Sequence, residues 1–213
     1  MRIALFGATG RLGGAILEAA LEAGHQVSAL VRDPSRVPIH CEALSVIAGD
    51  ARDENAVERT LGGCETVMIA LATSASKKVA ACKPLSAATR NIIGTMERLG
   101  IARLVVSSAK AIPMPGDAPD FKFKALRALV KLLVPRSHED SVEAVGIVAA
   151  SALDWTIVRV DRVSYKPRAG SVYAGPVDGR MRMGLTRGDA ANFMLHELAA
   201  REYVRKAPAL CSR

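Results

Sequence analysis

Three glycines spaced three residues apart follow the first apolar run of the chain and constrain its fold most strongly. The run is Arg2–Phe6, and the glycines are Gly7, Gly10 and Gly13. Gly7 permits a tight turn, Gly10 lets a ligand approach the backbone, and Gly13 lets the next helix pack on the strand. Such a helix points its free N–H groups and positive end at an anion. A strand, a glycine turn and a helix in this order predict a dinucleotide-binding unit rather than a purely structural turn.

Apolar strand-like runs alternate with helical segments through most of the chain. Beyond the first strand, the expected strands are Gln26–Val31, Ala43–Ala48, Thr66–Leu71, Arg103–Ser107 and Trp155–Val160, and the expected helices are Leu12–Glu22, Asn55–Leu61, Pro84–Leu99, Phe121–Val134, Ser141–Ala150 and Thr186–Ala200. Repeated β-α-β units predict a parallel sheet covered by helices on both faces. No long element is expected in 162–185, which is rich in Gly, Arg and Tyr.

We therefore expect an α/β fold, a Rossmann-type doubly wound parallel sheet in a three-layer α/β/α arrangement. Its strand order should be 3-2-1-4-5-6, with a seventh strand near Ala207–Leu210. No repeat or long linker divides the sequence, so a single domain should span 1–213. Its substrate-side loops are expected around 74–83, 110–136 and 162–185.

Composition indicates a globular protein and excludes several other classes. The chain has 213 residues, of which 50% are hydrophobic, and a net charge of +8. Its four cysteines are scattered without a C-x-x-C pair, so we expect reduced thiols of a cytoplasmic protein and no metal site. We expect no secretory signal, and no apolar stretch reaches the roughly 18 residues of a membrane-spanning helix. The net charge favours an anionic partner, which is nucleic acid, a membrane surface or a phosphorylated small molecule, and composition does not choose among them. Dispersed basic residues and 4% aromatics, with no recognition motif, argue against nucleic acid.

The end of the second expected strand indicates which dinucleotide binds. NAD-binding proteins usually place an acidic residue about 20 residues after the glycines, whereas NADP-binding proteins favour arginine. Arg32 stands at this position and Arg36 follows one short turn later. A guanidinium gives a 2′-phosphate forked, charge-assisted hydrogen bonds. We expect NADP(H) to be preferred, with NAD(H) as the alternative if the neighbouring Asp33 binds the ribose.

Six segments spread over nearly the whole chain carry a family resemblance. They are Phe6–Gly14, Leu30–Pro38, Gly49–Asp53, Thr89–Met96, Leu153–Arg159 and Thr186–Leu195. In these segments the chain resembles the atypical short-chain dehydrogenase/reductases with an NAD(P)H-binding, NmrA-like domain, and among them the biliverdin reductase B/flavin reductase-type proteins. The resemblance implies contacts to pyrophosphate from Thr9, Gly10, Arg11 and Leu12, to the 2′-phosphate from Arg32, Ser35 and Arg36, to adenine from Asp50 and Ala51, along the cofactor from Leu71, Ala72 and Thr73, and near the nicotinamide from Ser107 and Val160.

The residues that carry proton transfer in related enzymes are only partly present. None of the three tyrosines is followed four residues later by lysine, so the Tyr-x-x-x-Lys pair of ordinary short-chain dehydrogenases is absent. The flavin reductase-type relatives use a serine after the fifth strand, which falls near Ser108 or Ala109, and a histidine after the sixth, where this chain has Arg162. This pattern disfavours specific biliverdin reduction. Flavin reduction needs less, because a stacked ring accepts hydride directly once the site aligns the two rings.

Several polar residues near the expected substrate side have two interpretations. Ser107 and Ser108 are candidate catalytic residues, or they satisfy local backbone groups. Lys110 and Arg162 are candidate contacts to an anionic substrate, although a solvated side chain is the more common role. His138–Asp140 lacks a second histidine at metal-ligand spacing, which favours a helix-start cap.

The helix expected at Phe121–Val134 is basic and amphipathic, with Lys124, Arg127 and Lys131 along one face. Such a helix lies on a membrane or an acidic partner, or packs its apolar face over the substrate side of the domain, which is the more ordinary role.

These observations predict an NADPH-dependent reductase that transfers hydride to a small, flat, conjugated electron acceptor such as a flavin or a quinone. The protein should be a monomer or a homodimer. The alternative from another class is a non-catalytic, NmrA-like sensor of NAD(P)(H) redox state. A nucleotide-sugar epimerase-like enzyme ranks third, since that chemistry normally uses the Tyr/Lys pair.

Overall fold

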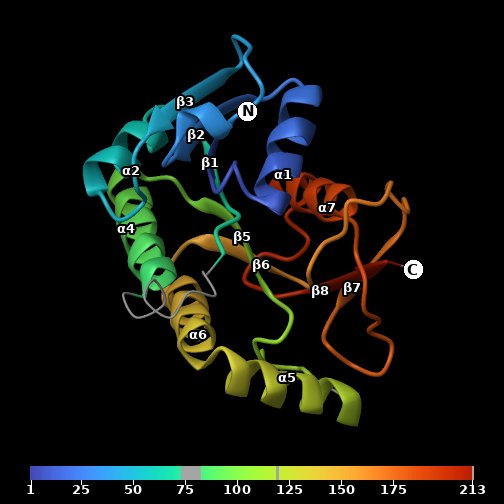
Figure 1. Cartoon of the computed structure of the whole chain (residues 1–213). Helices are drawn as coiled ribbons and strands as arrows, with labels where there is room; N and C mark the ends of the chain where they lie inside the picture. Colours follow the sequence, from blue (N-terminus) through green and yellow to red (C-terminus); the bar gives the residue numbers. More distant parts are fainter. Residues whose placement is uncertain (73–82, 119, 213) are drawn as a thin grey trace.

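The computed structural model describes residues 1–72, 83–118 and 120–212. Their core is an eight-stranded sheet with strand order β3-β2-β1-β4-β5-β6-β8-β7 (Figure 1). The strands are β1 (Arg2–Phe6), β2 (Gln26–Val31), β3 (Leu44–Ala48), β4 (Thr66–Ile69), β5 (Arg103–Ala109), β6 (Asp154–Val160), β7 (Val172–Gly175) and β8 (Ala209–Ser212).

The doubly wound parallel sheet expected from the sequence is confirmed. Strands β1 to β6 and β8 pair in parallel, and their order contains the predicted 3-2-1-4-5-6 arrangement. The strand expected near Ala207–Leu210 is β8. The expectation of no long element in 162–185 is confirmed, although the range contains the short strand Val172–Gly175, which pairs antiparallel with β8. This four-residue strand is too short for a periodic signal and depends on its partner.

Helices lie close to their expected positions. They are α1 (Arg11–Glu22), α2 (Glu54–Leu61), α4 (Pro84–Leu99), α5 (Phe121–Leu133), α6 (Pro135–Ala150) and α7 (Arg187–Ala200), with a 3₁₀ turn η1 (Pro34–Arg36). Helix α6 begins at Pro135 rather than at the expected Ser141, because proline is well suited to the first turn of a helix.

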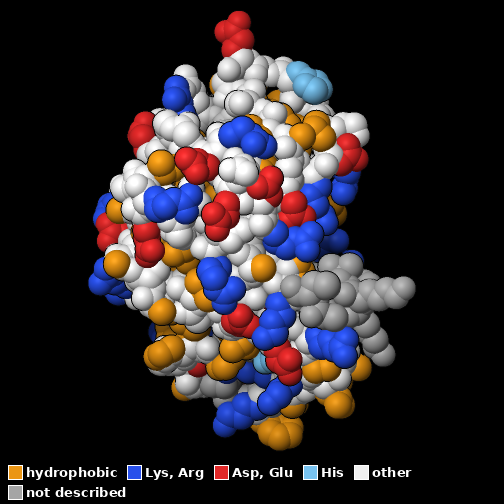
Figure 2. All heavy atoms as spheres, turned by 90° about the vertical axis from the view of Figure 1, so that its left-hand side faces the viewer, with side chains coloured by type: hydrophobic (Ala, Val, Ile, Leu, Met, Phe, Trp, Pro, Cys, Tyr) orange, Lys and Arg blue, Asp and Glu red, His pale blue; other side chains and the backbone are white. Residues whose placement is uncertain are grey.

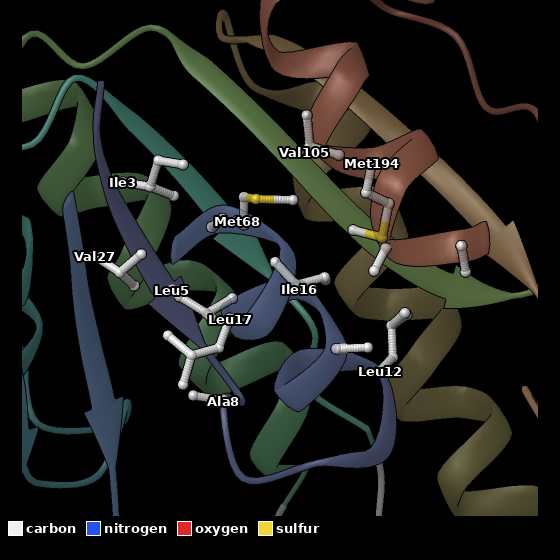
Figure 3. Packing of buried hydrophobic residues seen from close by; sticks show 14 of the residues in the cluster. Ile3, Leu5, Ala8, Leu12, Ile16, Leu17, Val27, Met68, Val105 and Met194 are labelled. Carbon is white, nitrogen blue, oxygen red and sulfur yellow. The ribbon is translucent and has the colours of Figure 1, made fainter. Parts of the chain in front are cut away.

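Successive side chains of a central strand are buried on opposite faces of the sheet, in two different hydrophobic clusters. In β1, Ile3 and Leu5 pack into the cluster formed with α1 and α7, whereas Ala4 and Phe6 pack into the cluster formed with α2, α4 and α6. Figure 3 shows the first cluster, in which Ile16 of α1 lies between residues of the strands and Met194 of α7. This period of two makes the three-layer arrangement.

The carboxyl ends of the parallel strands all lie at one edge of the sheet. Strands β2 and β3 continue to one side of β1, whereas β4, β5 and β6 continue to the other. The chain therefore changes winding direction between β1 and β4. Open α/β sheets bind ligands at such a switch point.

Candidate functional site

The glycine turn after β1 is fixed by close backbone contacts. Gly7 has φ +96°, and a Cβ there would lie 2.5 Å from the carbonyl oxygen of Ala70, just after β4. A Cβ on Gly13 would collide with the carbonyl oxygen of Gly7. Neither backbone contact can relax as a flexible side chain would. The turn therefore lies directly against the end of β4 and requires glycine at both positions.

The start of α1 leaves backbone donors available at this edge. Gly10 is the N-cap residue and has no side chain to cap the helix, and its own N–H donates to the Gly7 carbonyl at 2.9 Å. The first N–H groups of a helix have no partner within that helix. Leu12 is buried in the core, so it can offer a ligand only its backbone. The observed cradle of amides at a positive helix end fits a pyrophosphate.

Arg11 links this turn to the loop that follows β6. Its guanidinium donates to the carbonyl of Val163 at 3.3 Å and lies over the ring of Tyr165, 5.3 Å from the centroid. Arg187 lies over the same ring at 5.1 Å. The Nε of Arg11 is buried without a hydrogen-bond partner among the described residues. Arg11 thus belongs to the start of α1 through its backbone and contacts the expected substrate side through its side chain, whose Nε is an unused donor.

The segment after β2 contains an acidic residue that is hydrogen-bonded to a serine and two arginines whose guanidinium groups have no such partner. Asp33 accepts hydrogen bonds from the Ser35 hydroxyl at 2.6 Å and from the Ser35 N–H at 3.1 Å. These bonds hold the pKa of the Asp33 carboxyl below its usual value. Arg32 and Arg36 are exposed, and neither guanidinium makes a hydrogen bond or ion pair with a described residue, although the Arg36 N–H donates to the Asp33 carbonyl at 3.2 Å. The acid and the serine therefore satisfy each other, while both guanidinium groups remain available.

Asp50, expected near adenine, is held by its own loop. Its carboxylate accepts hydrogen bonds from the Arg52 side chain, each at 2.9 Å, and this arginine lowers its pKa. Asn91 of α4 donates to the carbonyls of Arg52 at 2.8 Å and Ala51 at 3.4 Å. The sequence analysis assigned no role to Asn91. The signal that could have identified it is a polar amide within the expected helix Pro84–Leu99. The guanidinium of Arg52 is therefore paired, in contrast to those of Arg32 and Arg36.

The end of β5 carries two serine hydroxyls without protein partners. Ser107 and Ser108 pair in register with Val158 and Arg159 of β6, beyond the last residue of β4. Both are half-buried, and neither hydroxyl makes a hydrogen bond to a described residue. Among the described residues, neither hydroxyl therefore satisfies a local backbone group, which was the alternative role, and both are available to a ligand.

The other residues expected along the cofactor lie at the same edge. Leu71 and Val160 pack partly against the core, and Ala72 is exposed. Thr73 and most of the expected loop 74–83 lie outside the described residues.

Lys110 is not the solvated side chain that its residue type suggested. It is 1% exposed, and its ammonium lies 2.6 Å from the carboxylate of Asp161 and 3.2 Å from the carbonyl of Arg182. Its N–H also donates to the Val160 carbonyl at 2.9 Å, which extends the pairing of β5 with β6. Lys110 therefore connects three segments of the substrate side, whereas Arg162 is exposed.

A buried carboxylate that the sequence analysis missed organises the loop after β5. Asp117 accepts two hydrogen bonds from Arg159, at 2.7 and 2.8 Å, and one from Arg127 at 2.6 Å. The N–H groups of Met114 and Val177 also donate to it. Burial favours the neutral acid, but these hydrogen bonds outweigh it and hold the pKa of Asp117 far below its usual range. The detectable signal was Arg159, a charge inside the apolar run of β6.

The His138–Asp140 segment lies inside α6 rather than at a helix start. Asp140 is buried and accepts hydrogen bonds from the N–H groups of Leu85 and Ser86, at 3.1 and 2.8 Å. It therefore caps α4, not its own helix. The described ranges contain no group of histidine, cysteine and acidic residues that could hold a metal ion.

Comparison with known proteins agrees with this geometry. The sequence model of a family described as NAD(P)H-binding matches residues 7–201. A curated relative, a 3-diazoavenalumate denitrifying reductase from a Streptomyces species, is 29% identical over 195 residues, which cover 87% of this chain and 60% of the relative. The chain thus spans less than two thirds of that protein's length.

Solved structures show the same fold at low identity. An anaerobilin reductase from Escherichia coli O157:H7 has a TM-score of 0.80 at 19% identity, with 100% of this chain and 97% of that chain covered. A short-chain dehydrogenase/reductase from Veillonella parvula DSM 2008, in complex with NADP, has a TM-score of 0.79 at 17% identity, with 98% and 93% covered.

Proposed function

The chain belongs to the NAD(P)H-binding family, and from this we propose that it is an NADPH-dependent reductase acting on a flat, conjugated acceptor such as a flavin or a quinone. The observation that carries the proposal is the glycine turn at the switch point between β1 and β4. Its close contacts at Gly7 and Gly13 and its uncapped helix start fit a dinucleotide pyrophosphate. When bound there, NADPH supplies a hydride from its nicotinamide ring.

Two positive regions of the proposed cofactor site match the two anionic groups of NADPH. The amides of Thr9, Arg11 and Leu12 stabilise the pyrophosphate through hydrogen bonds and the helix dipole, and Gly10, whose N–H donates to Gly7, lets the phosphates approach the backbone. Arg32 and Arg36 bind the 2′-phosphate. The Asp33 carboxylate, which would otherwise compete by binding the ribose, is instead hydrogen-bonded to Ser35. A 2′-phosphate therefore meets two unpaired guanidinium groups, which supports NADPH over NADH.

The acceptor is proposed to lie beneath the loops after β4, β5 and β6. Ser107 and Ser108 are its candidate hydrogen-bond donors, because their hydroxyls have no described partner. Lys110 and Asp117 act as positioning residues, since they fix the segments around 110–118 and 177–182 rather than present free charges. The reductase names of the Streptomyces and E. coli proteins support this reaction class.

The test combines nucleotide binding with turnover. Purified protein should consume NADPH when FMN, dichlorophenolindophenol or a quinone panel is supplied. In calorimetry, Arg32→Ala should weaken NADPH binding by about 1–3 kcal/mol, or roughly 5- to 150-fold, because a charge-assisted hydrogen bond is lost. NADH binding should change little. Arg59→Ala is the matched control, since Arg59 is an exposed arginine on α2. Equal weakening of both nucleotides would refute the NADPH assignment.

The second candidate function is a non-catalytic redox sensor. The absence of a Tyr-x-x-x-Lys pair in the sequence favours it, because no residue pair is present for the usual proton transfer. Tight NADPH binding without turnover on the whole acceptor panel would support the sensor and exclude the reductase. An absence of heat with every pyridine nucleotide would exclude both.

A further inference from the structure

Helix α5 has two apolar faces, and only one of them packs on the protein. Phe123 is 7% exposed and packs with Val177 and Met181 and with β8. On the opposite face, each apolar residue lies three or four positions from another, and all are exposed; they are Phe121, Ala125, Leu129, Leu132 and Leu133. We name these five residues the outer stripe. Its Phe121 and Leu132 are 83% and 77% exposed, which is unusual for large apolar side chains so close together.

The outer stripe has a border of positive charge. Lys124 and Lys131 are exposed and lie seven residues apart, two helical turns, along one edge of the stripe. The segment from Phe121 to Arg136 contains five basic residues and no acidic residue. Figure 2 shows orange and blue side chains together at the lower end of the molecule, where Figure 1 places α5. An apolar stripe bordered by lysines matches an anionic lipid surface.

The helix is fixed to the domain, so the outer stripe stays turned outward. Asp120 caps it by accepting a hydrogen bond from the Phe123 N–H at 2.8 Å. Arg127, on the inner side, pairs with the buried carboxylate of Asp117 at 2.6 Å. Phe123 adds apolar contact to the same side. Rotation of the helix to bury the stripe would break all three interactions.

We propose that α5 is an interfacial anchor that seats the protein on a membrane containing anionic lipid. The helix has 13 residues, and none of the helices in the described ranges could cross a bilayer. A short amphipathic helix instead lies in the interfacial plane, with its apolar side chains among the lipid tails and its lysines at the headgroups. The proposal is independent of the reductase activity, since neither the outer stripe nor its lysines contact the candidate nucleotide site.

A second copy of the chain is a poorer occupant of this surface. Two outer stripes packed together would bring their bordering lysines toward each other, and the segment 121–136 contains no acidic residue to pair with them. Like charges across an interface are destabilising. Anionic headgroups remove this repulsion, and each nearby lysine strengthens association with them.

The test is sedimentation of the full chain with lipid vesicles. The protein should bind vesicles of equimolar phosphatidylcholine and phosphatidylglycerol, but not vesicles of phosphatidylcholine alone, and added salt should weaken binding. Leu129→Gln combined with Leu132→Gln should lower partitioning at least about tenfold, because both side chains leave the lipid. Leu99→Gln is the control, since Leu99 is 45% exposed on α4 and lies outside the stripe.

A charge variant tests the electrostatic part separately. Lys131→Glu should lower partitioning by about fivefold or more, whereas Arg59→Glu on α2 makes the same change in net charge and should leave it unchanged. Circular dichroism should show that each variant keeps its helix content. The proposal is overturned if the chain does not sediment with anionic vesicles, if it binds both vesicle types equally, or if the leucine substitutions leave its partitioning unchanged. A dimer that these substitutions dissociate, without vesicle binding, also overturns it.

Discussion

Replacement of Asp117 by alanine should destabilise the fold strongly, because it leaves Arg159 buried without its counter-charge. Arg159 is 1% exposed, and the Asp117 side chain is 4% exposed, so water cannot replace the lost bonds. Removal of one partner from a buried ion pair costs about 3–5 kcal/mol. Asp117→Ala should lower the free energy of unfolding by that amount, measured by urea denaturation followed by circular dichroism at neutral pH.

Two comparisons make this prediction specific. Asp178→Ala removes an ion pair with Arg180 of the same 2.6 Å length at the surface, and it should leave stability nearly unchanged. Asp117→Leu combined with Arg159→Met removes the Asp117–Arg159 pair and should recover part of the loss, whereas Arg127 and the N–H groups of Met114 and Val177 stay without their acceptor. If Asp117→Ala costs less than about 1 kcal/mol, the carboxylate does not organise the loop as described.

The same carboxylate should contribute to acid sensitivity. The pKa of Asp117 is depressed in the folded protein, whereas the unfolded chain has the ordinary value near 4. The stabilisation is therefore complete above that ordinary value and is lost as pH falls through the folded pKa. Wild-type stability should decline below about pH 4, and Asp117→Ala should show a shallower decline in the same urea titration.

Three further outcomes are expected from the described contacts. Gly13→Ala should lower the free energy of unfolding by about 1–3 kcal/mol and weaken nucleotide binding, because its Cβ would strike the Gly7 backbone. In the same thermal unfolding and calorimetry experiments, Gly14→Ala should have little effect, because its Cβ would lie at an ordinary distance of 3.4 Å from its nearest neighbour. Asp140→Ala should remove about 1–2 kcal/mol of stability by uncapping α4, a loss that urea denaturation measures. Burial raises the pKa of the Cys64 thiol to about 11, so Ellman's reagent at pH 8 should modify Cys64 far more slowly than the exposed Cys41.

The order of the parallel strands was predictable because their apolar runs and the intervening helices are local patterns. The charged contacts were not, since they join residues far apart in the sequence. Asp117 and Arg159 are 42 positions apart, and Lys110 and Asp161 are 51 apart. Residue type favours solvation for each of these groups, and only the assembled sheet brings the partners together. The cofactor residues assigned after β2 and β5 stay predictions until a nucleotide-bound structure is determined.

Arg11 makes two regions of the molecule thermodynamically dependent on each other. Its backbone begins α1, whereas its guanidinium donates to the Val163 carbonyl and lies over the Tyr165 ring. An anion that draws this side chain toward α1 would loosen its grip on the loop after β6. Reciprocity then requires that whatever stabilises the loop in its present position opposes that anion by the same free energy. Coupling of this kind changes the affinity for the second ligand by the same factor, whichever ligand binds first.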